Sequence, residues 1–119
     1  TCLVHSDLNP KNLLVDPDTL EVTGVLDWEF AHAGHPWTDL GNLVRFERDP
    51  SYVAGVLGAW TARHGGAVDA LLDGARAADL WALVDLAARA GANPVADRAA
   101  ALLRAIAETG DLHARPAAS

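Results

Sequence analysis

The sequence is poor in the features that mark secreted, membrane-spanning and nucleic-acid-binding proteins. It has one cysteine, Cys2, so no disulfide can form within the chain, and we expect a cytoplasmic protein. No apolar run approaches the roughly 18 residues of a membrane span, and no basic, apolar leader opens the sequence. The 9 Lys and Arg residues are outnumbered by 16 Asp and Glu residues. This balance disfavours nucleic acid and anionic membrane surfaces as partners and weakly favours a cationic ligand.

The composition is that of a small globular domain. The chain has 119 residues, of which 50% are hydrophobic, enough for one modest core. Residues 1–46 contain short β-branched runs and turn residues, whereas residues 47–119 are rich in Ala, Leu and Arg with helical spacing. We therefore expect a single α+β domain, mainly helical. Because the chain opens at Thr1 within an apolar, strand-like run, we interpret it as an incomplete domain of a longer protein.

Turn and capping residues predict the main elements. Leu13 to Val15 and Val22 to Leu26 flank a Pro and Asp turn, which predicts a hairpin. Thr38 precedes a helical stretch and is expected to cap it. Three further helices are predicted: one begins at Asp49 and Pro50, one stops near Gly91, and one runs from Asn93 and Pro94 to Gly110.

The apolar stripes and charges of these helices give further expectations. The helix that stops near Gly91 is expected to bury Leu80, Leu83, Val84 and Ala87. After Gly110 a frayed tail is expected, through Ser119. Four aspartates of this region are expected on a solvated helix surface, although an acidic wall would also suit a polyamine substrate: Asp69, Asp73, Asp79 and Asp85.

Chemistry-bearing residues concentrate between two strand-like runs near the start of the chain. His5, Asp7 and Asn12 form the pattern H-x-D-x-x-x-x-N. An Asp on a rigid loop can accept the proton of an attacking hydroxyl, and an Asn five positions later can offer its amide oxygen to Mg²⁺ on nucleotide phosphates. The loop thus predicts a general base, Asp7, and a metal ligand, Asn12.

A second acid follows directly on the predicted hairpin. Asp27 comes 20 positions after Asp7, and a hairpin of that length would bring it to the ion held by Asn12. Oxygen ligands with phosphates and water suit octahedral Mg²⁺. Glu29 points the same way along an extended chain and is a weaker candidate for a metal or supporting role.

These motifs resemble those of a known family. The segment from His5 to Asn12 resembles the catalytic loop of the protein-kinase-like fold, and Leu26 to Glu29 resembles its metal-binding Asp-Phe-Gly element. Ser6 stands where protein kinases usually carry Arg, and Trp28 replaces Phe. The sequence is therefore closer to the aminoglycoside and choline phosphotransferases, and the segment from Gly34 to Gly41 is similar to a third motif of that family.

The resemblance implies a helical C-terminal lobe and an ATP-dependent, Mg²⁺-dependent kinase. It implies that the γ-phosphoryl group of ATP moves to a hydroxyl of a small molecule, such as an aminoglycoside-type antibiotic or a related amine alcohol. His5 is expected to hold the loop backbone, and Asp39 is expected to buttress the loop through hydrogen bonds. The sequence has no Gly-rich strand pair and no Val-Ala-Ile-Lys-like strand, so the N-terminal nucleotide-binding lobe is absent and we expect no turnover from these residues alone.

Two other readings stay open. A metal-dependent phosphohydrolase could use His5, Asp7, Asp27 and Glu29 as ligands for two ions. A non-catalytic interaction module derived from a kinase would explain the missing lobe, although the base and both metal-ligand positions hold the residue types that catalysis requires.

Overall fold

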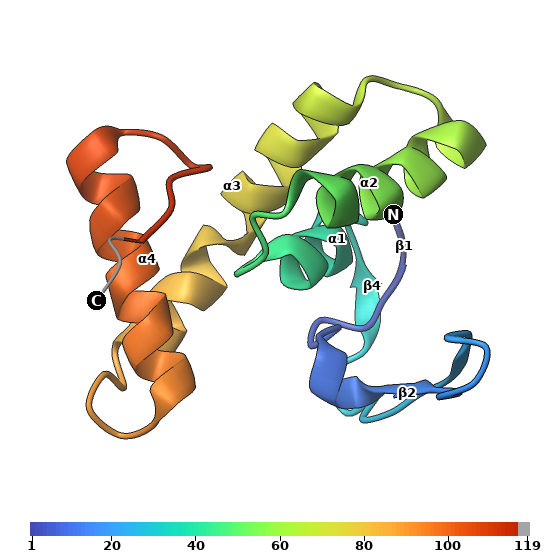
Figure 1. Cartoon of the computed structure of the whole chain (residues 1–119), viewed down its shortest axis with the longest axis horizontal. Coiled ribbons are helices and arrows are strands. Elements are labelled where there is room, and N and C mark those ends of the chain that lie inside the picture. Colours follow the sequence, from blue (N-terminus) through green and yellow to red (C-terminus); the bar gives the residue numbers. More distant parts are fainter. Residues whose placement is uncertain (117–119) are drawn as a thin grey trace.

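The computed structural model describes residues 1–116, in which short strands are followed by a helical part (Figure 1). The predicted α+β class is confirmed. In chain order the elements are β1 (Cys2–Val4), the 3₁₀ turn η1 (Pro10–Asn12), β2 (Leu13–Val15), β3 (Val22–Val25), β4 (His32–Gly34), α1 (Trp37–Val44), α2 (Pro50–His64), α3 (Val68–Ala87) and α4 (Pro94–Thr109).

The strands form two antiparallel pairs. β2 and β3 make the predicted hairpin, with Leu13 opposite Val25. β1 pairs with β4, with Val4 opposite His32. We did not anticipate β4, because three residues that include a glycine carry no readable strand pattern. The two pairs fix both ends of the segment between β1 and β2, which contains the H-x-D-x-x-x-x-N motif.

The helices α1, α2 and α3 share the first apolar cluster, which consists of Leu40, Val44, Val53, Leu57, Leu71 and Ala75. Two glycines allow α1 and α3 to pack closely. A Cβ on Gly41 would collide with the backbone oxygen of Ala75, and one on Gly74 would lie 2.7 Å from the Trp37 ring. Side chains larger than hydrogen at these two positions would force the helices apart.

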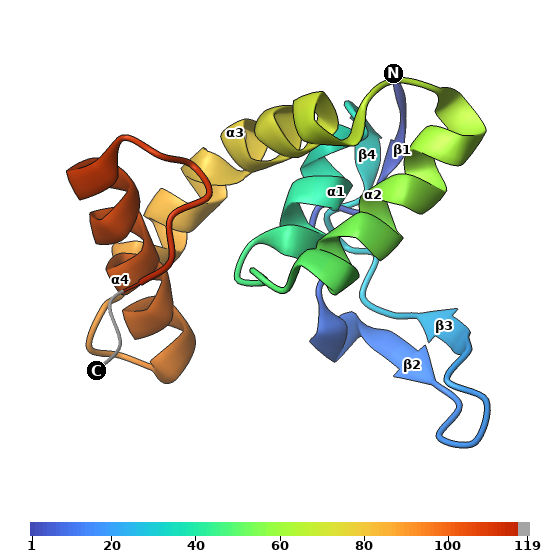
Figure 2. The ribbon, with the colours of Figure 1, turned by 45° about the horizontal axis from the view of Figure 1, so that its top comes forward.

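The second apolar cluster joins α3 to α4. The helix α4 lies apart from α1 and α2 (Figure 2). Leu83, Ala99 and Leu102 are the buried members of the cluster. The predicted starts of α2 and α4 are confirmed, because Asp49 accepts the N–H of Ser51 and Asn93 accepts that of Ala96. None of the helices within residues 1–116 is long and apolar enough to cross a bilayer.

Three local predictions are wrong. Thr38 does not cap α1, because the helix begins one residue earlier, at Trp37, and its cap position holds Pro36 without a side-chain bond. Val84 is 52% exposed rather than part of the core, since only one face of α3 reaches α4. Asp79 is buried rather than solvated, because it pairs with Arg45, the residue that follows α1, at 2.7 Å.

The tail after Gly110 was expected to fray, but the part of it that the structure describes makes contacts with the rest of the chain. Arg48 donates from Nε to the carbonyl oxygen of Ala114, and Ala114 is buried. His113 links the guanidinium of Arg76 to the carboxylate of Asp73. Burial, with the nearby guanidiniums of Arg76 and Arg115, lowers the pKa of Arg48 to about 10. Residues 117–119, to which the predicted tail extends, lie outside the described residues.

Candidate functional site

The loop after β1 is anchored by a carboxylate from α1. Asp39, in the first turn of that helix, accepts the backbone N–H of His5 at 2.9 Å and the backbone N–H of Ser6 at 2.9 Å. The backbone of Ser6 is left-handed, with φ of 74°, a conformation that non-glycine residues rarely adopt. The Asp39 carboxylate therefore holds the chain in a strained conformation immediately before Asp7.

The buried ring of His5 joins this loop to the end of β3. Its Nδ1 accepts the backbone N–H of Asp7 at 3.1 Å, and its Nε2 lies 2.7 Å from the carbonyl oxygen of Leu26. A nitrogen that accepts carries no proton, and a nitrogen that bonds a carbonyl oxygen must donate. His5 is thus the neutral tautomer protonated at Nε2, and it stabilises the loop rather than offering a free nitrogen to a ligand.

The Asp7 carboxylate is oriented by two asparagines. Its Oδ1 accepts from Asn9 Nδ2 at 2.7 Å, and its Oδ2 accepts from Asn12 Nδ2 at 3.1 Å. Lys11 Nζ lies 3.9 Å from the same Oδ2, but the lysine side chain is 71% exposed. The Asp7 side chain is 29% exposed, so it is positioned by neighbours and still open to solvent. An oriented, accessible carboxylate can accept a proton from a bound hydroxyl.

Asn12 lies beside the residue that precedes Asp27. The N–H of Leu26 donates to the carbonyl oxygen of Asn12 at 2.8 Å, which extends the hairpin pairing by one residue beyond Leu13 and Val25. Asn12 Nδ2 donates to Asp7, and its Oδ1 has no hydrogen-bond donor among the described residues. The backbone pairing and the His5 bond to Leu26 together bring the Asp7 loop against the Asp27 turn.

Asp27 occupies an unusual backbone position. Its φ is 67°, so it is left-handed like Ser6, and it is exposed with no hydrogen bond to another described residue. Left-handed non-glycine residues cluster at functional sites, where surrounding structure maintains the strain. Trp28, the next residue, lies with its ring 4.7 Å from that of His5 and donates to Val25 O. These contacts fix the turn and leave the Asp27 carboxylate uncommitted.

Glu29 is less closely tied to this constellation. It is exposed and makes no hydrogen bond within residues 1–116. No group of three or more His, Cys, Asp or Glu side chains in that range is placed to hold a metal. The donor set at the loop instead consists of one amide oxygen, on Asn12, and one carboxylate, on Asp27. Hard oxygen donors in this small number fit Mg²⁺, which retains water and takes its other ligands from phosphate oxygens.

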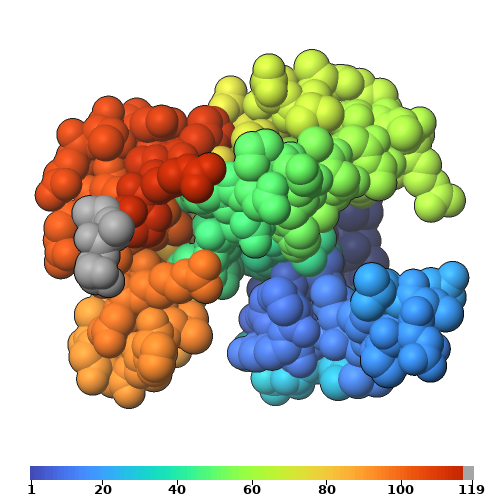
Figure 3. Space-filling view, in the orientation of Figure 1, coloured from blue at the N-terminus to red at the C-terminus, as the bar shows by residue number. Residues whose placement is uncertain are grey.

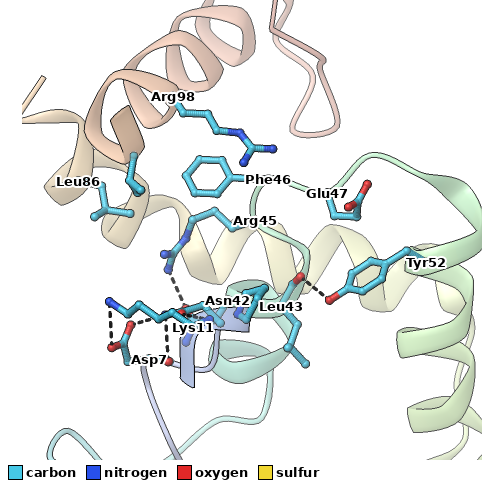
Figure 4. Close-up of a pocket in the computed structure, with 13 residues that line it drawn as sticks. Asp7, Lys11, Asn42, Leu43, Arg45, Phe46, Glu47, Tyr52, Leu86 and Arg98 are labelled. Atoms are coloured by element: carbon cyan, nitrogen blue, oxygen red, sulfur yellow. Dashed lines mark hydrogen bonds and ion pairs between the residues drawn. The ribbon is translucent and has the colours of Figure 1, made fainter. Parts of the chain in front are cut away.

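A cavity of about 390 Å³ opens beside Asp7 (Figure 4). Its volume lies in the range of small-molecule sites, about 300–1,000 Å³. The space-filling view shows this side of the molecule hollowed between the early residues and the segment near residue 90 (Figure 3). The lining residues come from the loop, the end of α1, the α1–α2 connection, the start of α2 and the facing ends of α3 and α4: Asp7, Asn9, Pro10, Lys11, Asn42, Leu43, Arg45, Phe46, Glu47, Tyr52, Leu86, Val95 and Arg98.

Sequence reasoning missed several of these residues. Asn9 occupies an unspecified position of the motif, yet it holds Asp7 and also caps η1 by accepting the N–H of Lys11. Its signal was available, because Asn before Pro is a common cap. Ser6 was noted only for replacing Arg, but its hydroxyl lies 3.0 Å from His32 Nδ1. The cavity residues of α3 and α4 had no local signal, since they meet Asp7 only through the tertiary fold.

Comparisons with known proteins agree with the motif reading. A family model described as the phosphotransferase enzyme family matches residues 1–72. Acyl-CoA dehydrogenase family member 11 of Mus musculus is 47% identical over 45 residues, and that of Rattus norvegicus is 44% identical over 45 residues. Each match covers 38% of this chain and 6% of the relative.

A further relative is Acyl-CoA dehydrogenase family member 10 of Mus musculus, which is 45% identical over 40 residues, or 34% of this chain and 4% of that protein. The chain therefore spans a small part of the length of the curated relatives it matches. No solved structure gives a significant match.

Proposed function

The chain belongs to the phosphotransferase enzyme family, and from that membership we propose that it is the catalytic part of a kinase for a small hydroxylated molecule. The reaction is the transfer of the γ-phosphoryl group of ATP to an acceptor hydroxyl. One observation carries the proposal: Leu26, immediately before Asp27, is hydrogen-bonded to both Asn12 and His5 of the catalytic loop. This linkage supports a shared site for the base and the phosphate-bound metal.

Asp7 is the proposed general base. The acceptor oxygen forms a bond to the γ-phosphorus, the bond from that phosphorus to the bridging oxygen of ADP breaks, and the hydroxyl proton passes to the Asp7 carboxylate. Asn9 and Asn12 orient that carboxylate through their Nδ2 donors. Positioned proton transfer of this kind contributes about a hundredfold to ten-thousandfold in rate.

Asn12 and Asp27 are the proposed Mg²⁺ ligands. Bound there, the metal would offset negative charge on the nucleotide phosphates. Asn12 is only 4% exposed, but its Oδ1 accepts no hydrogen bond from another described residue, and the Asp27 carboxylate is exposed. Glu29 has no such support, and its proposed part is limited to attracting the cation.

Nucleotide binding needs more than these residues. We propose that a second lobe, from additional polypeptide, grips the ATP phosphates and base. Exposed apolar side chains around the two strand pairs offer surface for it, including Leu3, Leu14, Leu20, Val22 and Phe30. A cytoplasmic location, where ATP and Mg²⁺ are abundant, suits this reaction and the single cysteine, Cys2.

The two alternatives have less support. A two-ion phosphohydrolase would need His5 as a ligand, but both ring nitrogens of His5 are occupied by hydrogen bonds within the chain. A non-catalytic module would not need uncommitted oxygen donors on Asn12 and Asp27 beside an oriented Asp7. The dehydrogenase activity in the relatives' names does not carry over, because the matches cover 4–6% of those proteins.

The test is phosphoryl transfer from γ-labelled ATP, with Mg²⁺ and a panel of hydroxylated acids, amines and antibiotics. It uses the natural polypeptide that contains this chain. Asp7→Asn should lower turnover about a hundredfold or more, because the base is lost. Asp69→Asn removes an exposed carboxylate elsewhere and should leave turnover unchanged. Release of free phosphate without any acceptor would indicate the hydrolase, and Asp7→Asn turnover within threefold of the parent would refute the base assignment.

A further inference from the structure

The cavity beside Asp7 is mainly lined by apolar side chains and hydrogen-bond donors. Phe46, Leu86 and Val95 provide apolar walls. The cationic groups of the lining are Lys11, Arg45 and Arg98, whereas the anionic ones are Asp7 and Glu47. A polycationic acceptor would need several uncommitted carboxylates here, and the lining does not provide them.

The charges of the lining differ in how far they are already paired. Arg45 is neutralised by Asp79, which accepts from its Nε at 2.7 Å and from its NH2 nitrogen at 2.7 Å. Glu47 accepts the backbone N–H groups of Arg48 and Asp49. Arg98 has no ion pair with another described residue, and its guanidinium lies 4.7 Å over the Phe46 ring. The lining therefore retains one guanidinium free to bind an anion.

Asn42 adds an unsatisfied donor to the same lining. Its Oδ1 accepts from Arg45, but its Nδ2 is buried without a partner among the described residues, and the residue is 5% exposed. A buried donor without a partner costs about 1–3 kcal/mol. A ligand oxygen that accepted a hydrogen bond from Asn42 Nδ2 would remove that cost. Both Arg98 and Asn42 thus favour a ligand rich in acceptor oxygens.

The arrangement in Figure 4 relates these groups to the base. The Asp7–Lys11 pair lies low on the left of the view with Leu86 above it, and Arg98 lies over Phe46 near the top. Glu47 and Tyr52 lie toward the right. A molecule with its hydroxyl at Asp7 and its body along Leu86 and Phe46 would present its far end to Arg98. The negative net charge of the chain does not oppose this, because exposed charges more than about 8 Å away are screened at physiological ionic strength.

We propose that the acceptor is a hydroxylated carboxylic acid with an apolar body, whose carboxylate binds Arg98 and whose hydroxyl meets Asp7. This inference rests on the proposed kinase function for the role of Asp7, but the carboxylate site itself does not require turnover. The proposed acceptor is an anion, whereas an aminoglycoside or an amine alcohol is a cation.

The test compares three probes of equal length for binding to the chain by calorimetry, without nucleotide or metal: 8-hydroxyoctanoate, 1,8-octanediol and 8-amino-1-octanol. The acid should bind most tightly, about tenfold more tightly than the diol, as one charge-assisted hydrogen-bonded pair allows. The amino alcohol should bind most weakly. A preference for the amino alcohol, or equal binding of all three, would overturn the proposal.

Arginine variants on α4 distinguish a specific carboxylate site from a general effect of positive charge on binding. Arg98→Gln should reduce the affinity for the acid to that for the diol, and Arg98→Lys should retain most of it. Arg104→Gln removes the same charge from an exposed position of α4 outside the cavity and should change the affinity less than twofold. Equal losses in Arg98→Gln and Arg104→Gln would contradict a built site.

The two proposals fail differently. If the acid binds through Arg98 but the natural polypeptide transfers no phosphoryl group, the kinase proposal is wrong and the carboxylate site stands. If phosphoryl transfer occurs only to cationic acceptors and the acid does not bind, the kinase proposal stands and the carboxylate site is wrong.

Discussion

Ser6 donates its backbone N–H to Asp39 Oδ1 at 2.9 Å, across 33 positions of sequence. The same carboxylate accepts the N–H of His5. A helix that packs on the core thereby fixes a left-handed residue directly before Asp7. The geometry of the loop depends on this tertiary contact rather than on local preference, because Ser gains nothing locally from a positive φ.

Replacing this anchor should loosen the loop. Asp39→Ala leaves the partly buried N–H groups of His5 and Ser6 without acceptors, and we expect a loss of about 2–4 kcal/mol in the free energy of unfolding. Asp39→Asn keeps one acceptor oxygen and should lose less. Urea denaturation measures the loss, and hydrogen exchange at the Ser6 amide should quicken in both variants. Unchanged exchange at Ser6 would show that the contact does not hold the loop.

The left-handed backbone at Asp27 predicts that glycine at this position does not destabilise the chain, although it removes the proposed metal ligand. Asp27→Gly removes the strain of a side chain at φ of 67° and should unfold at the same or a higher temperature than the parent. Asp27→Ala keeps a Cβ at this positive φ, and should be less stable than the glycine variant by about 1 kcal/mol. Thermal unfolding followed by circular dichroism decides this, and an alanine variant as stable as the glycine variant would exclude strain at this position.

Close packing of α1 on α3 predicts opposite effects for two glycine substitutions. Gly41→Ala forces a methyl group against the Ala75 carbonyl and should destabilise the chain by about 1–3 kcal/mol. Gly55→Ala, within α2, meets no atom within 4 Å and should stabilise it by about 0.5–1 kcal/mol. Chemical denaturation of both variants measures the difference. If the two behave alike, the helices are not packed as closely as the structure has them.

The buried pair of Asp79 and Arg45 predicts a pH effect. Burial raises the pKa of Asp79 above its ordinary value of 3.8, and the hydrogen bond and charge of Arg45 offset part of that rise. A carboxyl group with a raised native pKa binds its proton more tightly in the folded state, so its contribution to stability falls as the pH rises above 3.8 and through the native pKa.

Unfolding free energies of the parent and Asp79→Asn should be compared across that range. The parent should lose stability relative to the variant as the pH rises. A relative gain in stability with rising pH would mean that Arg45 lowers the native pKa more than burial raises it.

Much of the fold could be predicted because its signals are local. The hairpin follows from Pro and Asp between two apolar runs, and the starts of α2 and α4 follow from Asp49 and Asn93 before proline. The burial of Asp79 could not be predicted, since its partner Arg45 lies 34 positions away, just after α1. The packed tail around Ala114 likewise depends on Arg48, 66 positions earlier.

The candidate site could likewise be predicted only in part. The spacing of Asp7, Asn12 and Asp27 predicted one site from the hairpin length, and the Leu26 bonds are consistent with that expectation. Asn9 and the ring contacts of His5 depend on side-chain orientation, which motif spacing does not specify. Arg98 and Asn42 reach the cavity only because α1, α3 and α4 pack together, so neither residue has a signal in the surrounding sequence.

The most direct test of the account is paramagnetic broadening by Mn²⁺, a substitute for Mg²⁺ at oxygen sites, in ¹H–¹⁵N spectra of the chain. The account predicts that substoichiometric Mn²⁺ broadens the amide signals near Asn12 and Asp27 together, and that Asp27→Gly abolishes both effects. Broadening confined to the exposed aspartates of α3, such as Asp69 and Asp85, or broadening near Asn12 that persists in Asp27→Gly, would contradict a shared metal site.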